Sequence, residues 1–173
     1  MSTLKVGTIQ DPSNSNTAMT IDSSGRILTP ARPAFRAEKR ASNQTVTSTV
    51  TAQVTFEHEA FDIGSNYDTS TSRFTAPIAG IYHFNTVIRA VANGGTMDYV
   101  AMKLYKNGSL YADMFQMQTA VNQMGNSHIG GSATIQLAAT DYVSIHASIS
   151  GTSPYVGNHA TGQRTWFSGH LIG

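Results

Sequence analysis

From residue 33 to the end of the chain, hydrophobic positions come in short runs that are separated by polar turn residues. The runs are rich in β-branched and aromatic side chains, and no stretch keeps a helical period for more than three turns. Such runs are typical of β-strands, and strands repeated at short intervals are typical of a sandwich or barrel. The strand candidates are residues 46–56, 80–92, 97–106, 110–118, 127–137, 142–149 and 165–172.

Roughly eight strands at a spacing of about 8–15 residues predict an all-β fold, and in particular a two-sheet antiparallel jelly-roll sandwich. Asn107-Gly108 is expected to form a type I′ hairpin turn, because both residues tolerate a positive φ. Residues 139–141 should make a second tight connection. Gly80 is expected to let the chain turn into the next strand without steric cost. The loops at 93–95 and 151–163 should cluster at the ends of the sandwich.

Residues 1–31 differ from the remainder of the chain. Two small β elements are interrupted by the turn-rich residues 11–16, and Ser23-Ser24-Gly25 predicts a turn inside the second element. This region has too few apolar residues for a core of its own, so it needs a partner to become ordered. We interpret it as an attachment arm before a head domain at 32–173; a disordered leader is the alternative. The apolar residues assigned to the arm are Leu4, Val6, Ile9, Ile21 and Ile27.

The composition argues against several classes of function. Charged residues make up only 12% of the chain, with 11 Lys and Arg against 10 Asp and Glu, about half of the typical 25%. Such a surface has little long-range field, so we expect no nucleic-acid partner. Cys is absent, which excludes disulfides and thiolate chemistry. No apolar run is long enough for a membrane span or a secretory signal, so a product made in the cytoplasm is expected.

The segment 61–84, FDIGSNYDTSTSRFTAPIAGIYHF, combines aromatic residues, an Asn-Tyr pair, a Pro-containing turn and Gly-x-Tyr-x-Phe. It resembles the signature of the complement C1q globular-head family, which shares a jelly-roll fold with tumour necrosis factor. Further landmarks of the family occur in order at 32–35, 131–137, 141–143 and 165–172. The residues assigned to the core signature are Phe61, Asn66, Tyr67, Phe74, Pro77, Gly80, Tyr82, Phe84, Phe167 and Gly169.

The alternation of residues in 80–92 supports this assignment independently. On a strand, Tyr82, Phe84, Thr86 and Ile88 share one face, which offers two aromatic rings to a core between sheets. The resemblance also implies a compact homotrimer. A low charge density with many Met, Tyr and Phe residues is compatible with a subunit interface, although methionines also commonly fill gaps in a core.

The start of the chain, LKVGTIQDPSNSNTAMTIDSSGRI, resembles the opening of bacteriophage virion proteins, notably fibre and appendage proteins of marine and cyanobacterial phages. This resemblance implies a location on the virion, with other virion structural proteins as partners of the arm. No Gly-x-y repeat is present to form the collagen-like stalk of the animal relatives.

Catalytic or metal-binding chemistry is not predicted. In Glu57-His58-Glu59, the glutamates are expected on the face opposite the histidine, and residues 36–40 are interpreted as a solvated loop. No Gly-x-Ser-x-Gly elbow, phosphate loop or EF-hand loop is present. We therefore assign no catalytic residue, metal site or cofactor. Groups considered and not assigned are His83 and His170 near a three-fold axis, and Asp62, Asp68, Asp98 and Asp113 for calcium.

Together these patterns predict a non-enzymatic, trimeric phage fibre, appendage or decoration protein, whose head supports particle assembly and contacts a host-surface glycan or protein. The first alternative is a free-standing C1q-like module that binds carbohydrate or protein. A polysaccharide-degrading enzyme ranks third, because nothing in the sequence pairs the ten acidic residues. Loops vary at little cost to a sandwich, so receptor contact is assigned to Asn93, Thr96, Asn122, Asn126, Tyr155 and Asn158.

Overall fold

The computed structural model describes residues 4–94, 97–119 and 124–173. Within these ranges every regular element is a strand, which confirms the all-β prediction. The strands are β1 (Thr8–Gln10), β2 (Thr17–Ile21), β3 (Ile27–Leu28), β4 (Ala34–Glu38), β5 (Gln44–Thr45), β6 (Ala52–Gln53), β7 (His58–Ile63), β8 (Tyr67–Asp68), β9 (Arg73–Thr75), β10 (Gly80–Ala92), β11 (Tyr99–Lys106), β12 (Ser109–Gln118), β13 (Asn126–Leu137), β14 (Tyr142–Ile149), β15 (Pro154–Gly157) and β16 (Trp166–Leu171).

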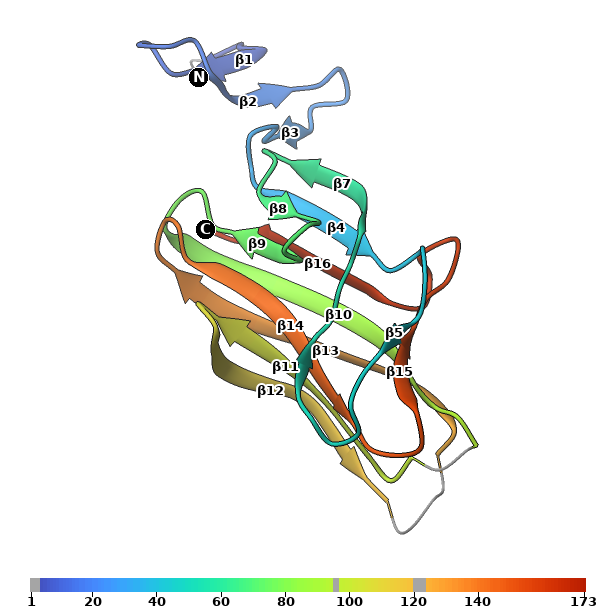
Figure 1. Ribbon diagram of the computed structural model, residues 1–173. Coiled ribbons are helices and arrows are strands. Elements are labelled where there is room, and N and C mark those ends of the chain that lie inside the picture. Colours follow the sequence, from blue (N-terminus) through green and yellow to red (C-terminus); the bar gives the residue numbers. More distant parts are fainter. Residues whose placement is uncertain (1–3, 95–96, 120–123) are drawn as a thin grey trace.

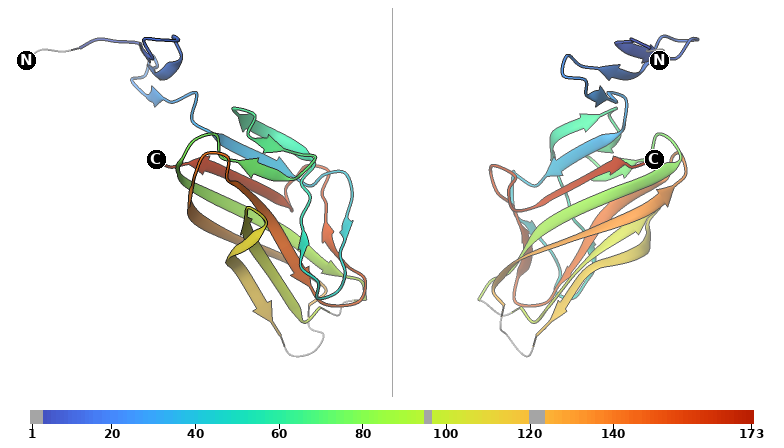
Figure 2. Two further views of the ribbon diagram at one scale, coloured as in Figure 1. Left: turned by 60° about the vertical axis from the view of Figure 1, so that its left-hand side comes forward. Right: turned by 180° about the vertical axis from the view of Figure 1, so that it is seen from behind.

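From β4 onward the strands form two antiparallel sheets that pack face to face (Figures 1 and 2). In the first, the β10 sheet, β13 pairs along one edge of β10, and β16 and then β15 pair along the other. Strands β4 and β7 continue this sheet beyond β16, and β5 continues it beyond β15. The second, the β14 sheet, has the order β12-β11-β14-β9-β8, with β6 also paired to β14. The predicted two-sheet jelly-roll sandwich is therefore confirmed.

Two predicted turns are present. Asn107 and Gly108 have φ values of 50° and 81°, as a type I′ turn between β11 and β12 requires. The Asn107 side chain also joins this hairpin to the next one: its Oδ1 accepts a hydrogen bond from the Tyr142 amide at 2.9 Å, and its Nδ2 donates one to Asp141 at 2.7 Å. In the second turn, between β13 and β14, Thr140 has a φ of 73°.

The strand predicted at 46–56 is wrong. Only β6 lies inside this range, and Thr49 has a left-handed φ of 64°. The segment crosses from one sheet to the other: the Val46 amide donates to Pro154 O beside the β10 sheet, and the Val54 amide donates to Ile145 O in the β14 sheet. A crossing chain cannot stay in one ladder, so its Thr and Val residues do not form a continuous strand.

An aromatic cluster fills the core between the two sheets. Phe35 stacks on Phe74 with ring centroids 4.8 Å apart and on Tyr67 at 4.9 Å, and it meets the edge of Phe167 at 5.0 Å. Phe84 lies among the same rings, 5.6 Å from Phe74. These residues come from β4, β8, β9, β10 and β16, so the cluster ties both sheets together. The predicted inward face of β10 is confirmed, because Tyr82, Phe84, Thr86 and Ile88 are all buried.

Two signature glycines have steric roles. A Cβ on Gly169 would lie 2.3 Å from a ring carbon of Phe84, so this position must lack a side chain for the rings to pack. Gly80 has no positive φ that would need glycine, contrary to the turn role expected from the sequence. A Cβ there would instead lie 2.6 Å from the Leu171 side chain, so close approach of β10 to the C-terminal residues explains this glycine.

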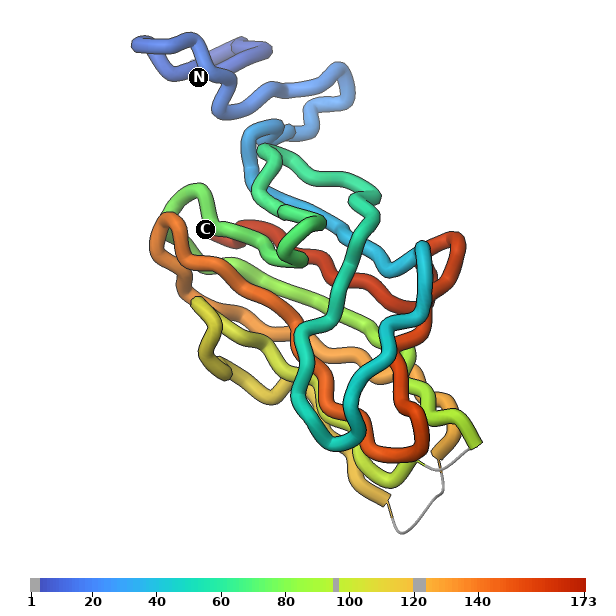
Figure 3. The backbone as a smooth tube through the Cα atoms, in the orientation of Figure 1, coloured from blue at the N-terminus to red at the C-terminus, as the bar shows by residue number. Residues whose placement is uncertain are grey.

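Strands β1 to β3 form a separate small sheet, and the Ser23-Ser24-Gly25 turn joins β2 to β3 as predicted. Figures 2 and 3 show that this arm lies at the end of the sandwich where the C-terminus also lies. The ends of β10 and β12 that lead to residues 93–97 and 119–125 are at the opposite end. The molecule therefore has an arm end and a loop end.

Candidate functional site

The outward face of the β10 sheet is an uncovered surface of the head. Along β10, residues Ile81, His83, Asn85, Val87 and Arg89 alternate with the buried ones. They lie opposite Gln136, Thr134, Ser132, Gly130 and His128 of β13. The β14 sheet packs on the other side of β10 (Figure 2), so the described part of the chain places no second layer over this face.

This face combines apolar side chains with few charges. Ile81 is 46% exposed and Phe61 is 49% exposed. Trp166 is half-buried beneath Arg36, whose guanidinium carbon lies 4.5 Å from the ring centroid. The rings of His83 and His170 meet across β10 and β16 at 5.8 Å. Exposed apolar side chains with little charge are typical of a surface that another protein covers.

Phe61 was predicted in the core, and the structure contradicts this. A bulge between Arg36 and Ala37 in the β4–β7 ladder sets Phe61 opposite Arg36, which faces outward. The neighbouring Asp62 instead accepts a hydrogen bond from the Tyr67 amide at 2.8 Å. Of the other signature residues, Pro77 is also exposed, and Asn66 donates to Ile63 O at 3.1 Å in a turn. Those that are buried are Tyr67, Phe74, Tyr82, Phe84, Phe167 and Gly169.

The assigned receptor residues do not form one loop cluster. Thr96 and Asn122 lie outside the described residues. Asn93 is exposed in a turn after β10, and Asn126 begins β13 at the same end. Residues 151–163 are not one loop, because β15 occupies part of them and places Tyr155 opposite Val91.

Asn158 has a structural role away from the loop end. Its amide donates to Asn43 at 3.0 Å, and its side chain donates to Arg40 O at 2.9 Å. These bonds brace the start of the β15–β16 connection against the segment after β4. A residue that is held in this way is poorly placed to adapt to a receptor, so the loop end retains Asn93, Asn126 and Tyr155 as described candidates.

The arm exposes most of its apolar residues. Leu4, Ile9, Ile21 and Ile27 are exposed, and Val6 is half-buried. Strands β1 to β3 pair with one another, with no sheet layered on them within residues 4–94, 97–119 and 124–173. Asp22 holds the β2–β3 turn through hydrogen bonds from the amides of Ser24 and Arg26, both at 2.9 Å. The arm therefore has a defined turn and no core of its own.

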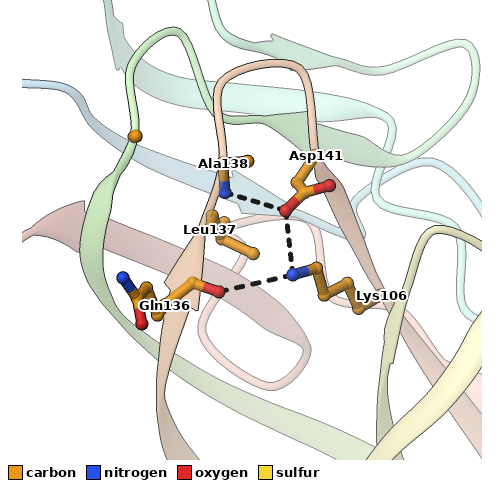
Figure 4. Close-up of a pocket in the computed structure, with 6 residues that line it drawn as sticks. Lys106, Gln136, Leu137, Ala138 and Asp141 are labelled. Atoms are coloured by element: carbon orange, nitrogen blue, oxygen red, sulfur yellow. Dashed lines mark hydrogen bonds and ion pairs between the residues drawn. The ribbon is translucent and has the colours of Figure 1, made fainter.

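A hollow of about 340 Å³ lies at the arm end of the sandwich, lined by Ala79, Lys106, Gln136, Leu137, Ala138 and Asp141 (Figure 4). Lys106 Nζ lies 2.8 Å from Asp141 Oδ2 and donates to Gln136 O at 3.4 Å. The hydrogen bond from Lys106 is the main reason that the pKa of Asp141 is lowered to about 2. Lys106 and Asp141 bind each other and the nearby backbone. The interactions that line this hollow therefore link the two sheets, and they leave neither charge without a partner.

Residues 36–40 are not the solvated loop predicted from the sequence. Glu38 is buried, and its carboxylate accepts hydrogen bonds from Arg36 Nε at 2.7 Å and from Arg40 Nε at 2.8 Å. Lys39 is buried as well, which lowers its pKa, and its Nζ lies 3.6 Å from Glu57. The nearby Gly162 leaves room for the Glu38 carboxylate. The cations of this run are therefore held by two carboxylates, Glu38 inside the run and Glu57 outside it.

Acid–base chemistry was not predicted from the sequence. The structure nevertheless brings a serine and a histidine together, Ser144 and His146. Ser144 Oγ lies 3.2 Å from His146 Nε2. Burial and then the charge of Arg73 lower the pKa of His146, and Lys103 lies opposite His146 in the β11–β14 ladder, whereas a hydrolase would need a carboxylate to orient the ring. Within the described residues, no group of three or more His, Cys, Asp or Glu could hold a metal ion, and no helix could cross a membrane.

His146 makes the stability of the fold sensitive to pH. Burial, aided by Arg73, lowers the pKa of His146 from 6.5 to about 4. Below pH 6.5 the unfolded chain therefore binds a proton that the folded protein does not bind until the pH is near 4. Protonation of the unfolded chain therefore lowers the free energy of unfolding as the pH falls from 6.5 toward 4. Above pH 6.5, His146 is neutral in both states and causes no such loss.

We expect the wild type to unfold at a lower urea concentration at pH 5 than at pH 7.5. For His146→Gln, the difference between the two urea midpoints should be smaller. The measurement is urea unfolding at the two pH values with equal protein concentrations. Parallel pH profiles for the two proteins would contradict this role of His146.

Comparisons with known proteins agree with this architecture. Residues 34–172 match the C1q domain, which covers most of the chain. The chain belongs to the C1q domain family. Among solved structures, it is similar to the globular domain of a zebrafish complement 1qA protein, with a TM-score of 0.57 and 18% identity over 82% of this chain and 98% of that one. It is also similar to the Eiger TNF of S. frugiperda, with a TM-score of 0.61 and 11% identity over 83% and 94% of the two chains.

Membership of the C1q domain family gives the signature segment a structural meaning. Phe74, Tyr82 and Phe84 lie in its core cluster, and Gly169 keeps that cluster compact. The match begins at residue 34, the first residue of β4, so the arm lies outside it.

Proposed function

We propose that this chain forms a homotrimer that acts as a non-enzymatic attachment head on a bacteriophage particle. The arm docks on other virion structural proteins, and the head projects outward as a fibre tip, appendage or decoration. The loop end and the sides of the head contact a host-surface glycan or protein. The observation that carries the proposal is the uncovered, weakly charged face of the β10 sheet in a C1q-family fold.

A second copy of the chain is the occupant proposed for this face. The face belongs to a seven-stranded sheet and exposes Ile81, Phe61 and Ile63, with Trp166 half-buried among them. Its charged groups already have partners: Arg36 pairs with Glu38, and Arg89 donates to Asn126 at 3.1 Å. A face with few charged groups, each already hydrogen-bonded within the chain, suits a permanent contact between subunits.

The arrangement of the two ends supports attachment through the arm. The arm and the candidate receptor residues Asn93 and Asn126 lie at opposite ends of the sandwich (Figure 1). A head that is fixed by its arm would therefore point its loop end away from the particle. The exposed Leu4, Ile9 and Ile27 give the arm an apolar surface that a virion protein would cover.

Deletion of residues 1–28 tests the attachment role. We expect the shortened chain to fold, because the arm makes its own small sheet and the core cluster lies entirely beyond residue 33. We also expect its incorporation into phage particles to fall by at least about tenfold, measured by quantitative mass spectrometry of purified particles. Ile27→Asp should reduce incorporation, and Ile78→Asp at an exposed turn of the head should not. Unchanged incorporation of the shortened chain would contradict the proposal.

The second candidate is a free-standing recognition module without a virion. It is favoured by the similarity of residues 34–172 to the globular domain of a complement protein. The two candidates differ in where the protein is found. Presence in purified phage particles at a fixed copy number favours the attachment head, and secretion of a trimer by uninfected cells favours the free module.

A further inference from the structure

The outward face of the β14 sheet differs from that of the β10 sheet, because it gathers aromatic rings around a cation. Along β14, Val143, Ile145 and Ala147 are core residues, so Tyr142, Ser144 and His146 face outward. Register places Tyr105 of β11 opposite Ser144, and Thr75 of β9 opposite Tyr142. Arg73 lies two residues before Thr75 and therefore shares its face.

Two ring contacts organise this surface. The guanidinium carbon of Arg73 lies 4.3 Å from the centroid of the Tyr142 ring. Tyr105 stacks on His146 with centroids 3.8 Å apart and an angle of 19° between the rings. Ser144 is buried between these pairs, and its Oγ is 3.2 Å from His146 Nε2. We call Arg73, Tyr105, Tyr142, Ser144 and His146 the Arg73 cluster.

Arg73 differs from the other half-buried arginines of the described chain because it has no oxygen partner. Arg36 and Arg40 share the Glu38 carboxylate, and Arg89 bonds to Asn126. Arg73 has the Tyr142 ring on one side, and its Nε is buried without an acceptor. A buried donor that lacks an acceptor costs free energy, so a position of this kind calls for a functional explanation.

Asp68 lies opposite Arg73 in the β8–β9 ladder, but among the described residues its carboxylate accepts hydrogen bonds from Ser70 and Thr71 and forms no ion pair with the guanidinium. The carboxylate of Asp113 on the same sheet lies 3.8 Å from Lys103 and is balanced by it. A planar guanidinium fixed on a ring presents its remaining N–H groups in a rigid fork, which matches a carboxylate or a sulfate. The rings of Tyr105 and Tyr142 supply flat apolar surface, and Ser144 and His146 supply polar atoms. Aromatic surface with a few convergent polar groups suits a ring-shaped, hydroxyl-rich ligand.

We propose that the Arg73 cluster binds an acidic saccharide, with Arg73 pairing to its carboxylate or sulfate and Tyr105 packing against a sugar ring. This inference rests on the proposed function, because it names the chemical class that the head recognises. The site lies on the side of the sandwich opposite the face assigned to the trimer contact, so three copies would remain open in the assembled head (Figure 2).

The test is calorimetric titration of the full chain with three oligosaccharides of equal length: oligogalacturonate, a heparin fragment and neutral dextran. We expect binding of at least one acidic saccharide and none of dextran. Arg73→Met should weaken that binding by about tenfold or more, since it removes hydrogen bonds between charged groups. Arg73→Lys should give an intermediate loss, because it keeps the charge and loses the fork. Arg32→Met, at an exposed arginine just before β4, is the matched control and should bind like the wild type.

A second readout does not depend on the variants folding. In the wild type, the saccharide should shift the NMR signals of the His146 ring and leave those of His159, on the β15–β16 connection, unchanged. Equal binding of dextran, equal shifts with sodium acetate or sulfate alone, or no binding of any acidic saccharide would overturn the inference. Those results would leave trimer mass and particle incorporation untouched, so they separate failure of this site from failure of the attachment role.

Discussion

Replacing Phe84 by alanine is expected to lower the free energy of unfolding by about 3–5 kcal/mol. Phe84 is 0% exposed and its ring lies 5.6 Å from Phe74, 5.7 Å from Phe167 and 6.3 Å from Phe35. Its removal leaves a cavity between the two sheets at the point where rings from four strands meet. The measurement is urea unfolding at a fixed protomer concentration, because the stability of an oligomer depends on that concentration.

Tyr111→Ala is the control for this substitution. Tyr111 is also an aromatic residue on a strand, but it is 51% exposed. Its loss should change the free energy of unfolding by no more than about 0.5 kcal/mol, as is usual for surface substitutions. Similar effects of the two substitutions would mean that the β10 residues do not alternate as described.

Ile81→Glu is expected to convert the trimer into a monomer that remains folded. Ile81 is 46% exposed on the β10 sheet face, so the change should cost the isolated head little. In the trimer, three carboxylates would enter an apolar contact without cationic partners, which is strongly unfavourable. Size-exclusion chromatography with light scattering measures the outcome.

Ile78→Glu gives a matched control, since Ile78 is 51% exposed and lies three residues earlier, in the turn before β10. This variant should remain a trimer. If Ile81→Glu also remained a trimer at micromolar concentration, the outward face of the β10 sheet could not be the subunit contact.

The sequence predicted the elements whose cause is local. The strict alternation around Tyr82 and Phe84 identifies the buried face of β10, because a strand has a period of two. Asn107-Gly108 predicts its hairpin because few other pairs accept two positive φ values. Both depend on neighbouring residues alone.

Features that depend on distant partners were missed. Phe61 belongs to the signature segment, but the bulge in the β4–β7 ladder, which sets the register, turns it outward. Arg73 was not singled out, because its partner Tyr142 is brought to it only by the pairing of β9 with β14. The run at 36–40 looked solvated because it is rich in charged residues. The partners that allow Glu38 and Lys39 to be buried, among them Glu57, are brought together only by the fold. No local pattern carries this information.

The central claim is that the β10 sheet face joins three copies of the chain into one attachment head. The most direct test is the mass of the purified full-length protein in solution by multi-angle light scattering, at several concentrations and at pH 7.5. We predict a single species with three times the 18.5 kDa mass of the chain. A species of 18.5 kDa at all concentrations would contradict the account.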